Sequence, residues 1–148
     1  METLYIHLME KAFVIFRLPN YSKNLRNELS KSQIINFYDN GIRNAIIGAF
    51  SPFDLRNDKG QLWENYLVNE RKKYFNNYEI KKQIYFWRTS QQQEIDLIEE
   101  NNGIINAYEF KYTNSSKVKF TKTFSNAYPN STFETIDKDN YLKFVGIE

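Results

Sequence analysis

A short Asn-Gly turn is the feature that most constrains the fold of this chain of 148 residues. Asn102-Gly103 joins two segments in which apolar and polar residues alternate, Gln93 to Glu99 and Ile104 to Tyr112. Asn-Gly between such segments is typical of a two-residue β-hairpin turn, because both turn residues must adopt a positive φ. The turn therefore predicts two antiparallel strands and fixes which residues face each other.

The hairpin register brings acidic side chains together. Counting back from the turn, Asp96 faces Glu109 and Glu94 faces Lys111. Facing side chains in an antiparallel pair have Cβ atoms about 4.5–5.5 Å apart, and like charges there destabilise the sheet. Two carboxylates in register therefore indicate that a positive charge lies between them.

Two interpretations of this acidic face are open. It is either an exposed polar face, with Glu94 paired with Lys111 and the other carboxylates solvated, or a divalent metal site. In the second case Asp96 and Glu109 hold the ion and Lys111 lies beside it. Hard oxygen ligands favour Mg²⁺ or Mn²⁺ over zinc. Apolar residues on the same face favour the metal site, because a half-buried carboxylate pair without a cation costs several kcal/mol.

The second half of the chain predicts an α/β domain. The expected elements are a helix from Gly60 to about Phe75, strands at Gln83–Arg88, Gln93–Glu99 and Ile104–Tyr112, a helix near Ser116–Ala127 and a strand at Thr132–Ile136. The order α-β-β-β-α-β predicts a mixed sheet covered by helices.

The first 50 residues predict an extension to this domain. The expected elements are a helix at Glu2–Lys11, strands at Phe13–Phe16 and Ile34–Tyr38, and a helix at Ile42–Ile47 closed by Gly48. The early part of this order resembles the tail of a winged-helix unit. We expect residues 1–50 and the α/β domain of residues 51–148 to form one compact unit, since the chain has the length of about one domain.

Composition excludes several kinds of protein. With no cysteine, the chain has no disulfides, thiolate metal sites or cysteine nucleophiles. Its 41% hydrophobic and 17% aromatic content predicts a packed core rather than disorder. No apolar run reaches the roughly 18 residues that a membrane helix needs, and no signal peptide opens the chain. We therefore expect a cytoplasmic protein without a membrane partner.

Charged and aromatic clusters leave further alternatives open. Lys117, Lys119 and Lys122 suit a phosphate backbone, but a solvated helix face explains them equally. Trp63, Trp87 and the tyrosines are expected in the core, with stacking on nucleic-acid bases as the alternative.

Four residues in order resemble the active site of the PD-(D/E)XK nuclease superfamily. They are Glu64 on the first helix, Asp96 on a strand, and Glu109 and Lys111 in the run Glu109-Phe110-Lys111. The resemblance implies a restriction-endonuclease-like mixed sheet that binds Mg²⁺ or Mn²⁺. It also implies that Asp96, Glu109 and Glu64 are metal ligands and that Lys111 acts on the attacking water or the phosphorane charge. The alternative for Glu64 is an ion pair with Arg71.

A second resemblance covers more of the chain. It rests on the motifs Phe37 to Asn44, Arg56 to Gly60, Trp63-Glu64-Asn65, Phe86-Trp87-Arg88 and Gln93 to Leu97. With these motifs the chain is similar to the C-terminal domain of uncharacterised prokaryotic AAA-type ATPases, a domain without an established function, in which a P-loop ATPase and a winged helix lie upstream. The chain has no G-x-x-x-x-G-K-[ST] sequence, and ATP turnover cannot be carried over. We expect a fragment, a truncated gene product or a stand-alone relative.

Two functions follow as hypotheses. The leading hypothesis is metal-dependent phosphodiester hydrolysis of DNA, or a decayed nuclease-like domain that only binds DNA. The alternative is a non-catalytic interaction or regulatory domain for an AAA-type ATPase. The complete set of Glu64, Asp96, Glu109 and Lys111 favours the first hypothesis. The net charge of +2, which is small for a nucleic-acid-binding chain, favours the second.

Overall fold

The Asn102-Gly103 turn organises the larger of two β-sheets. In the computed structural model of the chain, the two turn residues have φ angles of 51° and 81°. The strands on either side pair in antiparallel register from Asn101–Ile104 to Leu97–Tyr108. The predicted turn is therefore confirmed, and so is the register over this stretch.

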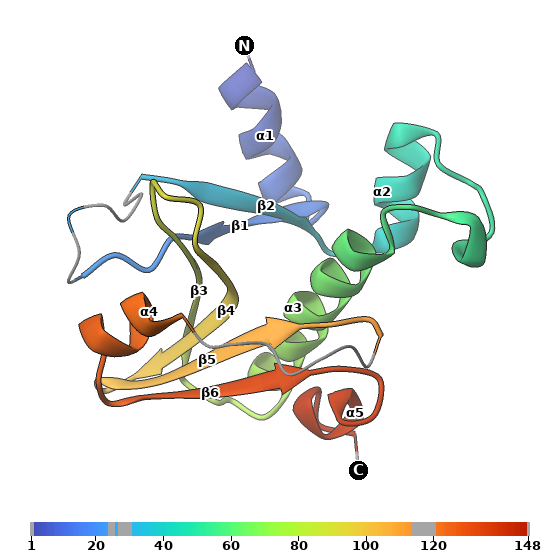
Figure 1. Cartoon of the computed structure of the whole chain (residues 1–148). Helices are drawn as coiled ribbons and strands as arrows, with labels where there is room; N and C mark the ends of the chain where they lie inside the picture. Colours follow the sequence, from blue (N-terminus) through green and yellow to red (C-terminus); the bar gives the residue numbers. More distant parts are fainter. Residues whose placement is uncertain (1, 24–25, 27–30, 114–120, 148) are drawn as a thin grey trace.

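The structure describes residues 2–23, 26, 31–113 and 121–147, which form a mixed α/β fold (Figure 1). The elements are α1 (Glu2–Lys11), β1 (Ile15–Pro19), β2 (Gln33–Phe37), α2 (Asn40–Ile47), the 3₁₀ turn η1 (Phe53–Leu55), α3 (Lys59–Asn77), β3 (Gln83–Arg88), β4 (Glu94–Asn101), β5 (Ile104–Phe110), α4 (Lys122–Ala127), β6 (Ser131–Ile136) and α5 (Tyr141–Phe144). The predicted order α-β-β-β-α-β is present from α3 to β6. Part of the predicted helix near Ser116–Ala127, including Lys117 and Lys119, lies outside the described residues.

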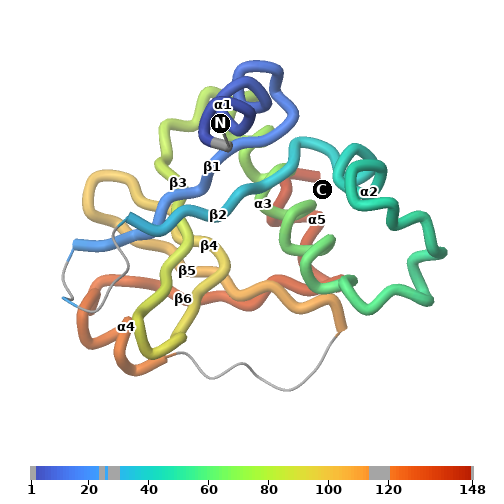
Figure 2. Tube along the Cα trace, turned by 90° about the horizontal axis from the view of Figure 1, so that it is seen from above, coloured from blue at the N-terminus to red at the C-terminus, as the bar shows by residue number. Residues whose placement is uncertain are grey.

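The four-stranded sheet has the order β3-β4-β5-β6. β3, β4 and β5 are antiparallel neighbours, and β6 pairs with β5 in parallel. α3 and α5 cover one face, and α4 lies on the other (Figures 1 and 2). Each face has its own apolar core, and β4 and β5 contribute to both. These two strands are therefore the centre of the domain.

A fully buried carboxylate ties α3 to the sheet. Glu99 on β4 is 0% exposed, and its Oε1 accepts a 2.6 Å hydrogen bond from Nε of Arg71 on α3. Its Oε2 accepts a 2.9 Å bond from the Lys82 ammonium. Arg71 also donates to the backbone carbonyl of Phe144 in α5, and its guanidinium lies 4.5 Å from the ring centroid of that residue. The buried Glu99 and its partner Arg71 thus link α3, β4 and α5.

The N-terminal extension is attached along the β3 edge of the sheet. β1 and β2 form their own antiparallel pair. Beyond β1, the Asn20 side chain both accepts from the N–H and donates to the carbonyl of Arg88, and Tyr21 N–H donates to Phe86. The predicted strand at Phe13–Phe16 is displaced: β1 begins two residues later and ends three residues later, and Phe13, with a φ of 55°, cannot extend the strand.

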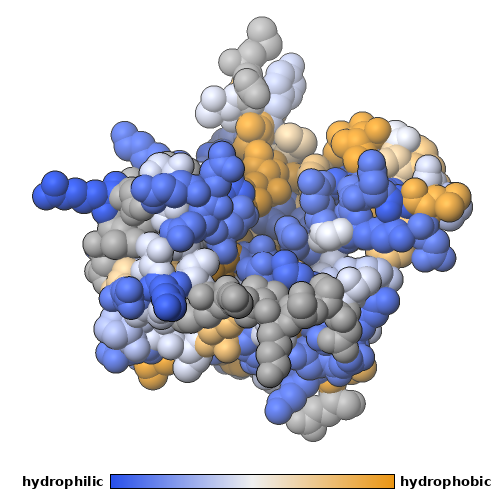
Figure 3. All heavy atoms as spheres, in the orientation of Figure 1, coloured by the Kyte–Doolittle hydropathy of each residue, from blue (hydrophilic) through white to orange (hydrophobic). Residues whose placement is uncertain are grey.

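Apolar side chains remain at the surface of the extension. Figure 3 shows them near the base of α1 and around α2 and η1. The exposed residues of the extension and of the adjoining η1 are Leu4, Tyr5, Leu8, Phe13, Ile35, Ile42, Ile46, Ile47, Phe50, Phe53 and Leu55. In the described part of the chain, no helix has both the length and the apolar character needed to cross a membrane.

The buried ion cluster gives a stability prediction. Glu99→Gln leaves the charges of Arg71 and Lys82 without a counter-charge in a dry site, and breaking such a pair costs about 3–5 kcal/mol. Urea unfolding should show this loss in the free energy of unfolding. Glu70→Gln is the matched control, because the Glu70–Lys73 pair on the same helix is more exposed and should change stability by less than about 1 kcal/mol. Equal effects of the two substitutions would contradict the role of Glu99.

Candidate functional site

Asp96 lies where the central strands separate. The pairing of β4 with β5 ends at Leu97–Tyr108, and the next link is a side chain: Oδ2 of Asp96 accepts a 2.7 Å bond from Phe110 N–H. On the β3 side, two β4 residues, Asp96 and Leu97, stand opposite the single residue Phe86. Bulges of this kind bend a strand and redirect a side chain, and they are frequent beside active sites. The bulge places the Asp96 carboxylate at the divergence of the strands.

Glu109 and Lys111 form an ion pair at the end of β5. The Lys111 ammonium donates to Oε1 of Glu109 over 2.8 Å, and the Lys111 N–H bonds to the Ile136 carbonyl, which fixes the strand end to β6. The alternative pairing of Lys111 with Glu94 is wrong. Glu94 instead pairs with Arg88 over 2.8 Å, because the shifted β3–β4 register places those two residues opposite each other.

Glu64 on α3 belongs to the same group of charges. The alternative ion pair with Arg71 is wrong, since Arg71 is bound to Glu99. The pKa of Glu64 is raised, mainly by burial and then by the negative charges of Glu94 and Glu109, while the Lys111 ammonium opposes the shift. No hydrogen bond to the Glu64 carboxylate is present within the described part of the chain.

The pKa of Asp96 responds to the charges of these groups. Burial is the main reason that the pKa of Asp96 rises to about 8, and the charges of Glu109 and Glu64 raise it further. The Phe110 N–H and the Lys111 ammonium act in the opposite direction. Burial lowers the pKa of Lys111, but Glu109, Asp96 and Glu64 outweigh it, and the net shift is upward. The structure therefore brings the four predicted residues into one electrostatic cluster.

The charge balance and the donor set of this cluster fit a divalent cation. Three carboxylates against one ammonium leave a formal charge of −2 when all are ionised, and Mg²⁺ prefers carboxylate oxygens. One oxygen each of Asp96 and Glu109 has no hydrogen bond to any described residue. Among the described residues, no three acidic or histidine side chains stand close enough to hold an ion without moving. Glu64 and Glu109 would have to rotate toward Asp96 to complete a ligand shell.

Residues that sequence reasoning did not assign a role position the start of α3. Oδ1 of Asn65 accepts the N–H of Phe37 over 2.8 Å, and its amide donates to the carbonyl of the same residue and to Asn40. Asp58 binds Arg56 and Arg43, which hold the pKa of its carboxyl well below its usual range. These residues lie in the motifs that carry the resemblance to the C-terminal domain of AAA-type ATPases. Nothing else in the sequence indicated that they have a role.

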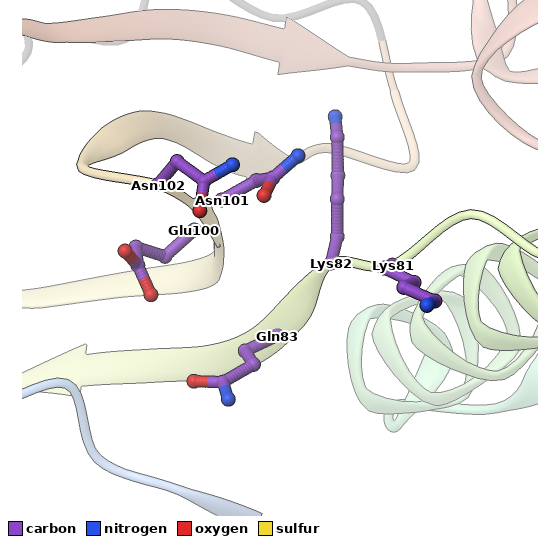
Figure 4. A pocket seen from close by; sticks show the side chains of 6 residues that line it. All are labelled: Lys81, Lys82, Gln83, Glu100, Asn101 and Asn102. Atoms are coloured by element: carbon purple, nitrogen blue, oxygen red, sulfur yellow. The ribbon is translucent and has the colours of Figure 1, made fainter.

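A further polar cavity of about 350 Å³ lies at the other end of the β4–β5 hairpin (Figure 4). It is lined by Lys81, Lys82, Gln83, Glu100, Asn101 and Asn102. The Lys82 ammonium is bound to Glu99, and Lys81 points away from the asparagines in Figure 4. The cavity is thus separate from the carboxylate cluster, and its lysines do not point toward a common position where a ligand could bind.

Of the predicted DNA-contacting lysines, only Lys122 is described, and it is exposed on α4.

Comparisons with known proteins match most of the chain. The family model of DUF4143, a domain of unknown function, matches residues 59–142, and that of DUF8612, also of unknown function, matches residues 3–52. Uncharacterized protein Rv2008c of Mycobacterium tuberculosis and Uncharacterized protein Mb2031c of Mycobacterium bovis are each 26% identical over 116 residues. The match covers 77% of this chain and 25% of each relative, so the chain spans about a quarter of their length. No solved structure matches the chain.

The raised pKa of Asp96 predicts a pH dependence of stability. Between the ordinary value of 3.8 and the folded value of about 8, the folded protein holds this proton more tightly than the unfolded chain. Stability in EDTA should therefore fall as pH rises through this window. Asp96→Asn keeps an acceptor for Phe110 N–H but cannot ionise, so its melting temperature should fall less between pH 5 and 9. Asp54→Asn, on exposed η1, should follow wild type. If the melting temperature of Asp96→Asn falls with pH in parallel with that of wild type, burial does not keep Asp96 protonated.

Proposed function

We propose that this chain, which belongs to the DUF4143 family of domains of unknown function, hydrolyses phosphodiester bonds of DNA with a divalent metal ion, or binds DNA as a decayed form of such a nuclease. One observation supports the proposal: Glu64, Asp96 and Glu109, from three elements, lie within one another's electrostatic influence together with the Lys111 ammonium, and the pKa of Asp96 rises to about 8. A carboxylate cluster of this charge is stabilised by a cation, and metal-bound carboxylates are a common device for phosphoryl chemistry.

The roles of the four residues follow from their positions and from the PD-(D/E)XK resemblance. Asp96, at the strand divergence, is the central ligand for Mg²⁺ or Mn²⁺, and Glu109 is the second, with the Phe110 carbonyl beside it. Glu64 completes the shell from α3. A bound divalent ion neutralises phosphate charge and makes a bound water more acidic. Lys111 orients or activates the attacking water, or neutralises the charge that develops on the phosphorane.

The resemblance supports DNA as the substrate, and local charge is compatible with it. Nucleases of that superfamily place the same residue types on the same order of elements. Lys122 at the start of α4 and Lys138 after β6 are exposed cations that can contact a phosphate backbone. The small net charge means that contacts to DNA must be concentrated near the site rather than spread over the surface.

A second candidate function rests on the extension. Ten large apolar side chains are exposed on α1, the turn after it, α2 and η1, and exposed patches of this kind mark interaction sites. In this alternative the chain is a non-catalytic interaction or regulatory domain for an AAA-type ATPase, with α1 to β2 as the tail of a winged helix. The mycobacterial relatives are about three times as long as this chain, since the 116 matched residues are 25% of each, and this greater length is compatible with such a context.

The enzyme proposal predicts the effect of removing the ammonium. Lys111→Ala should abolish Mg²⁺-dependent nicking of plasmid DNA while leaving the fold and DNA affinity nearly unchanged, because Lys111 acts on the transition state. Lys73→Ala, which removes an exposed cation of α3 that pairs with Glu70, is the control and should keep full activity. Residual activity that is equal in wild type and Lys111→Ala would assign the nicking to a contaminant or another site. If no variant nicks DNA but DNA binding is salt-sensitive, the result supports the decayed nuclease-like domain, which binds DNA without cleaving it.

The metal site predicts a change in melting temperature. An ion that binds only the folded state at about ten times its Kd adds about 1.4 kcal/mol, which raises the melting temperature by a few degrees in a domain of this size. Asp96→Asn should remove most of the response to Mg²⁺ or Mn²⁺ and should melt no lower than wild type in EDTA. Glu100→Gln, which changes a β4 acid at the far end of the hairpin, should keep the response. If Mn²⁺ gives no shift beyond that of matched ionic strength, the carboxylates are not a metal site.

A further inference from the structure

An aromatic cavity lies beside the carboxylate cluster. It measures about 310 Å³, within the usual size of small-ligand sites, and most of its surface is apolar. The lining residues come from α2, η1, α3 and the end of β5, and they are Asn40, Asn44, Phe53, Leu62, Trp63, Tyr66 and Tyr112. Four of the seven are aromatic. The sequence left stacking on nucleic-acid bases open for Trp63 and the tyrosines but did not predict this cavity, and the four-residue site does not account for it.

The rings of the cavity form a connected set that is only partly buried. Trp63 stacks on Tyr66 with centroids 5.8 Å apart, and its edge contacts Tyr112 at 5.7 Å. Tyr112 in turn contacts Phe53 at 5.1 Å in a T-shaped arrangement. Phe53 is 39% exposed, and the other three rings are only half-buried. The rings therefore line a surface that solvent reaches, unlike Trp87, which is 0% exposed in the sheet core.

The polar groups of the cavity include a donor that lacks a partner. The Trp63 indole N–H is buried without an acceptor in the described part of the chain. A buried tryptophan N–H normally has a hydrogen-bond partner. The amides of Asn40 and Asn44 also line the space, and that of Asn40 already donates to the Leu62 carbonyl. A flat ligand with acceptor atoms on its edge would accept a hydrogen bond from the Asn44 amide while stacking on the rings.

Cations stand at the outer rings. The Lys138 ammonium lies 4.2 Å from the Tyr112 ring centroid, and the Lys59 ammonium lies 5.9 Å from that of Phe53. No carboxylate is among the residues that line the cavity. The combination of stacking rings, hydrogen-bonding amides and flanking cations matches the way proteins hold unpaired nucleotides, with the base on aromatic side chains and the phosphates on lysines.

The cavity and the carboxylate cluster share two elements. Trp63 and Glu64 are adjacent on α3, and Lys111 and Tyr112 are adjacent at the end of β5. Neighbouring positions of the same two elements thus serve the cluster and the cavity. A DNA strand whose phosphate reaches Asp96 and Lys111 would therefore bring a neighbouring base to the side of α3 and of the β5 end where Trp63 and Tyr112 lie.

We propose that the cavity formed by Phe53, Trp63, Tyr66 and Tyr112 binds an unpaired nucleobase by stacking, so that the DNA bound at this site is single-stranded, or has an unpaired stretch, next to the phosphate that enters the carboxylate cluster. The inference rests on the proposed function for the identity of the ligand as DNA. A base inside a duplex is stacked on its neighbours and paired with its partner, and it cannot enter the cavity unless it is extruded.

Binding rather than cleavage tests the inference. The probe is a fluorescently labelled oligothymidylate of 12 nucleotides, and a 12-base-pair duplex is the comparison, both measured by anisotropy with Mg²⁺ on the Lys111→Ala background. The single strand should bind more tightly than the duplex. Tyr112→Leu and Phe53→Leu should each weaken single-strand binding by about five- to a hundredfold, the range found for removing one stacking ring. Duplex binding should change by less than twofold.

Tyr78→Leu is the matched control, because Tyr78 is 65% exposed at the other end of α3, and it should leave both affinities unchanged. Melting curves establish that each variant is folded. If Tyr112→Leu does not fold, Phe53→Leu still tests the inference, because Phe53 is exposed and its replacement disturbs the core less. Absence of single-strand binding, or equal loss for single strand and duplex, overturns the inference. Wild-type cleavage of duplex DNA that Tyr112→Leu does not change also overturns it and leaves the nuclease proposal standing. Ring-dependent single-strand binding without any cleavage by the wild type supports the cavity and removes the hydrolytic function alone.

Discussion

The buried contact between Arg71 and Glu99 sets the position of α3 on the sheet, and the site depends on that position. Glu64 and Arg71 are seven residues apart, so they lie on the same face of α3 and about 10.5 Å apart along its axis. Asp96 and Glu99 are three residues apart on β4, or about 10 Å. Fixing Arg71 on Glu99 therefore brings Glu64 level with Asp96. A structural ion pair at one end of the helix assembles the carboxylates at the other.

Asp96 and Glu99, two of the four acidic residues of β4, differ in how their charge is compensated. Glu99 receives hydrogen bonds from both a guanidinium and an ammonium, which is what a fully buried carboxylate needs to stay in a stable fold. Asp96 receives one backbone N–H, and its nearest charged neighbours include two further carboxylates. The same strand thus carries a compensated acid, which contributes to stability, and an uncompensated one, which reduces stability at neutral pH. Such uncompensated groups are typical of functional sites.

Local signals in the sequence were sufficient for the hairpin and for the order of elements. The Asn102-Gly103 turn acts over two residues and fixes the register from Asn101–Ile104 to Leu97–Tyr108, whereas the predicted facing pair of Asp96 and Glu109 lies beyond the last paired residues, where the strands separate. The Arg71–Glu99 contact could not be predicted, because its partners are 28 residues apart and no local pattern selects one acid among several. The pairing of Glu94 with Arg88 was missed because it depends on the β4 bulge, which adds one residue without a glycine or proline to mark it. Glu64 was placed by resemblance alone.

The charge of the cluster and the cavity beside it impose an order on binding. With its carboxylates ionised and no cation present, the cluster repels a phosphate, and the repulsion is strong where the groups are shielded from water. The aromatic rings carry no net charge, and Lys59 and Lys138 attract a strand toward them. A DNA strand therefore has a favourable contact with the aromatic rings beside Tyr112. Its contact with the carboxylate cluster beside Lys111 is unfavourable until a bound cation makes it favourable. The base can anchor the strand first, and the cation then determines whether the phosphate can follow.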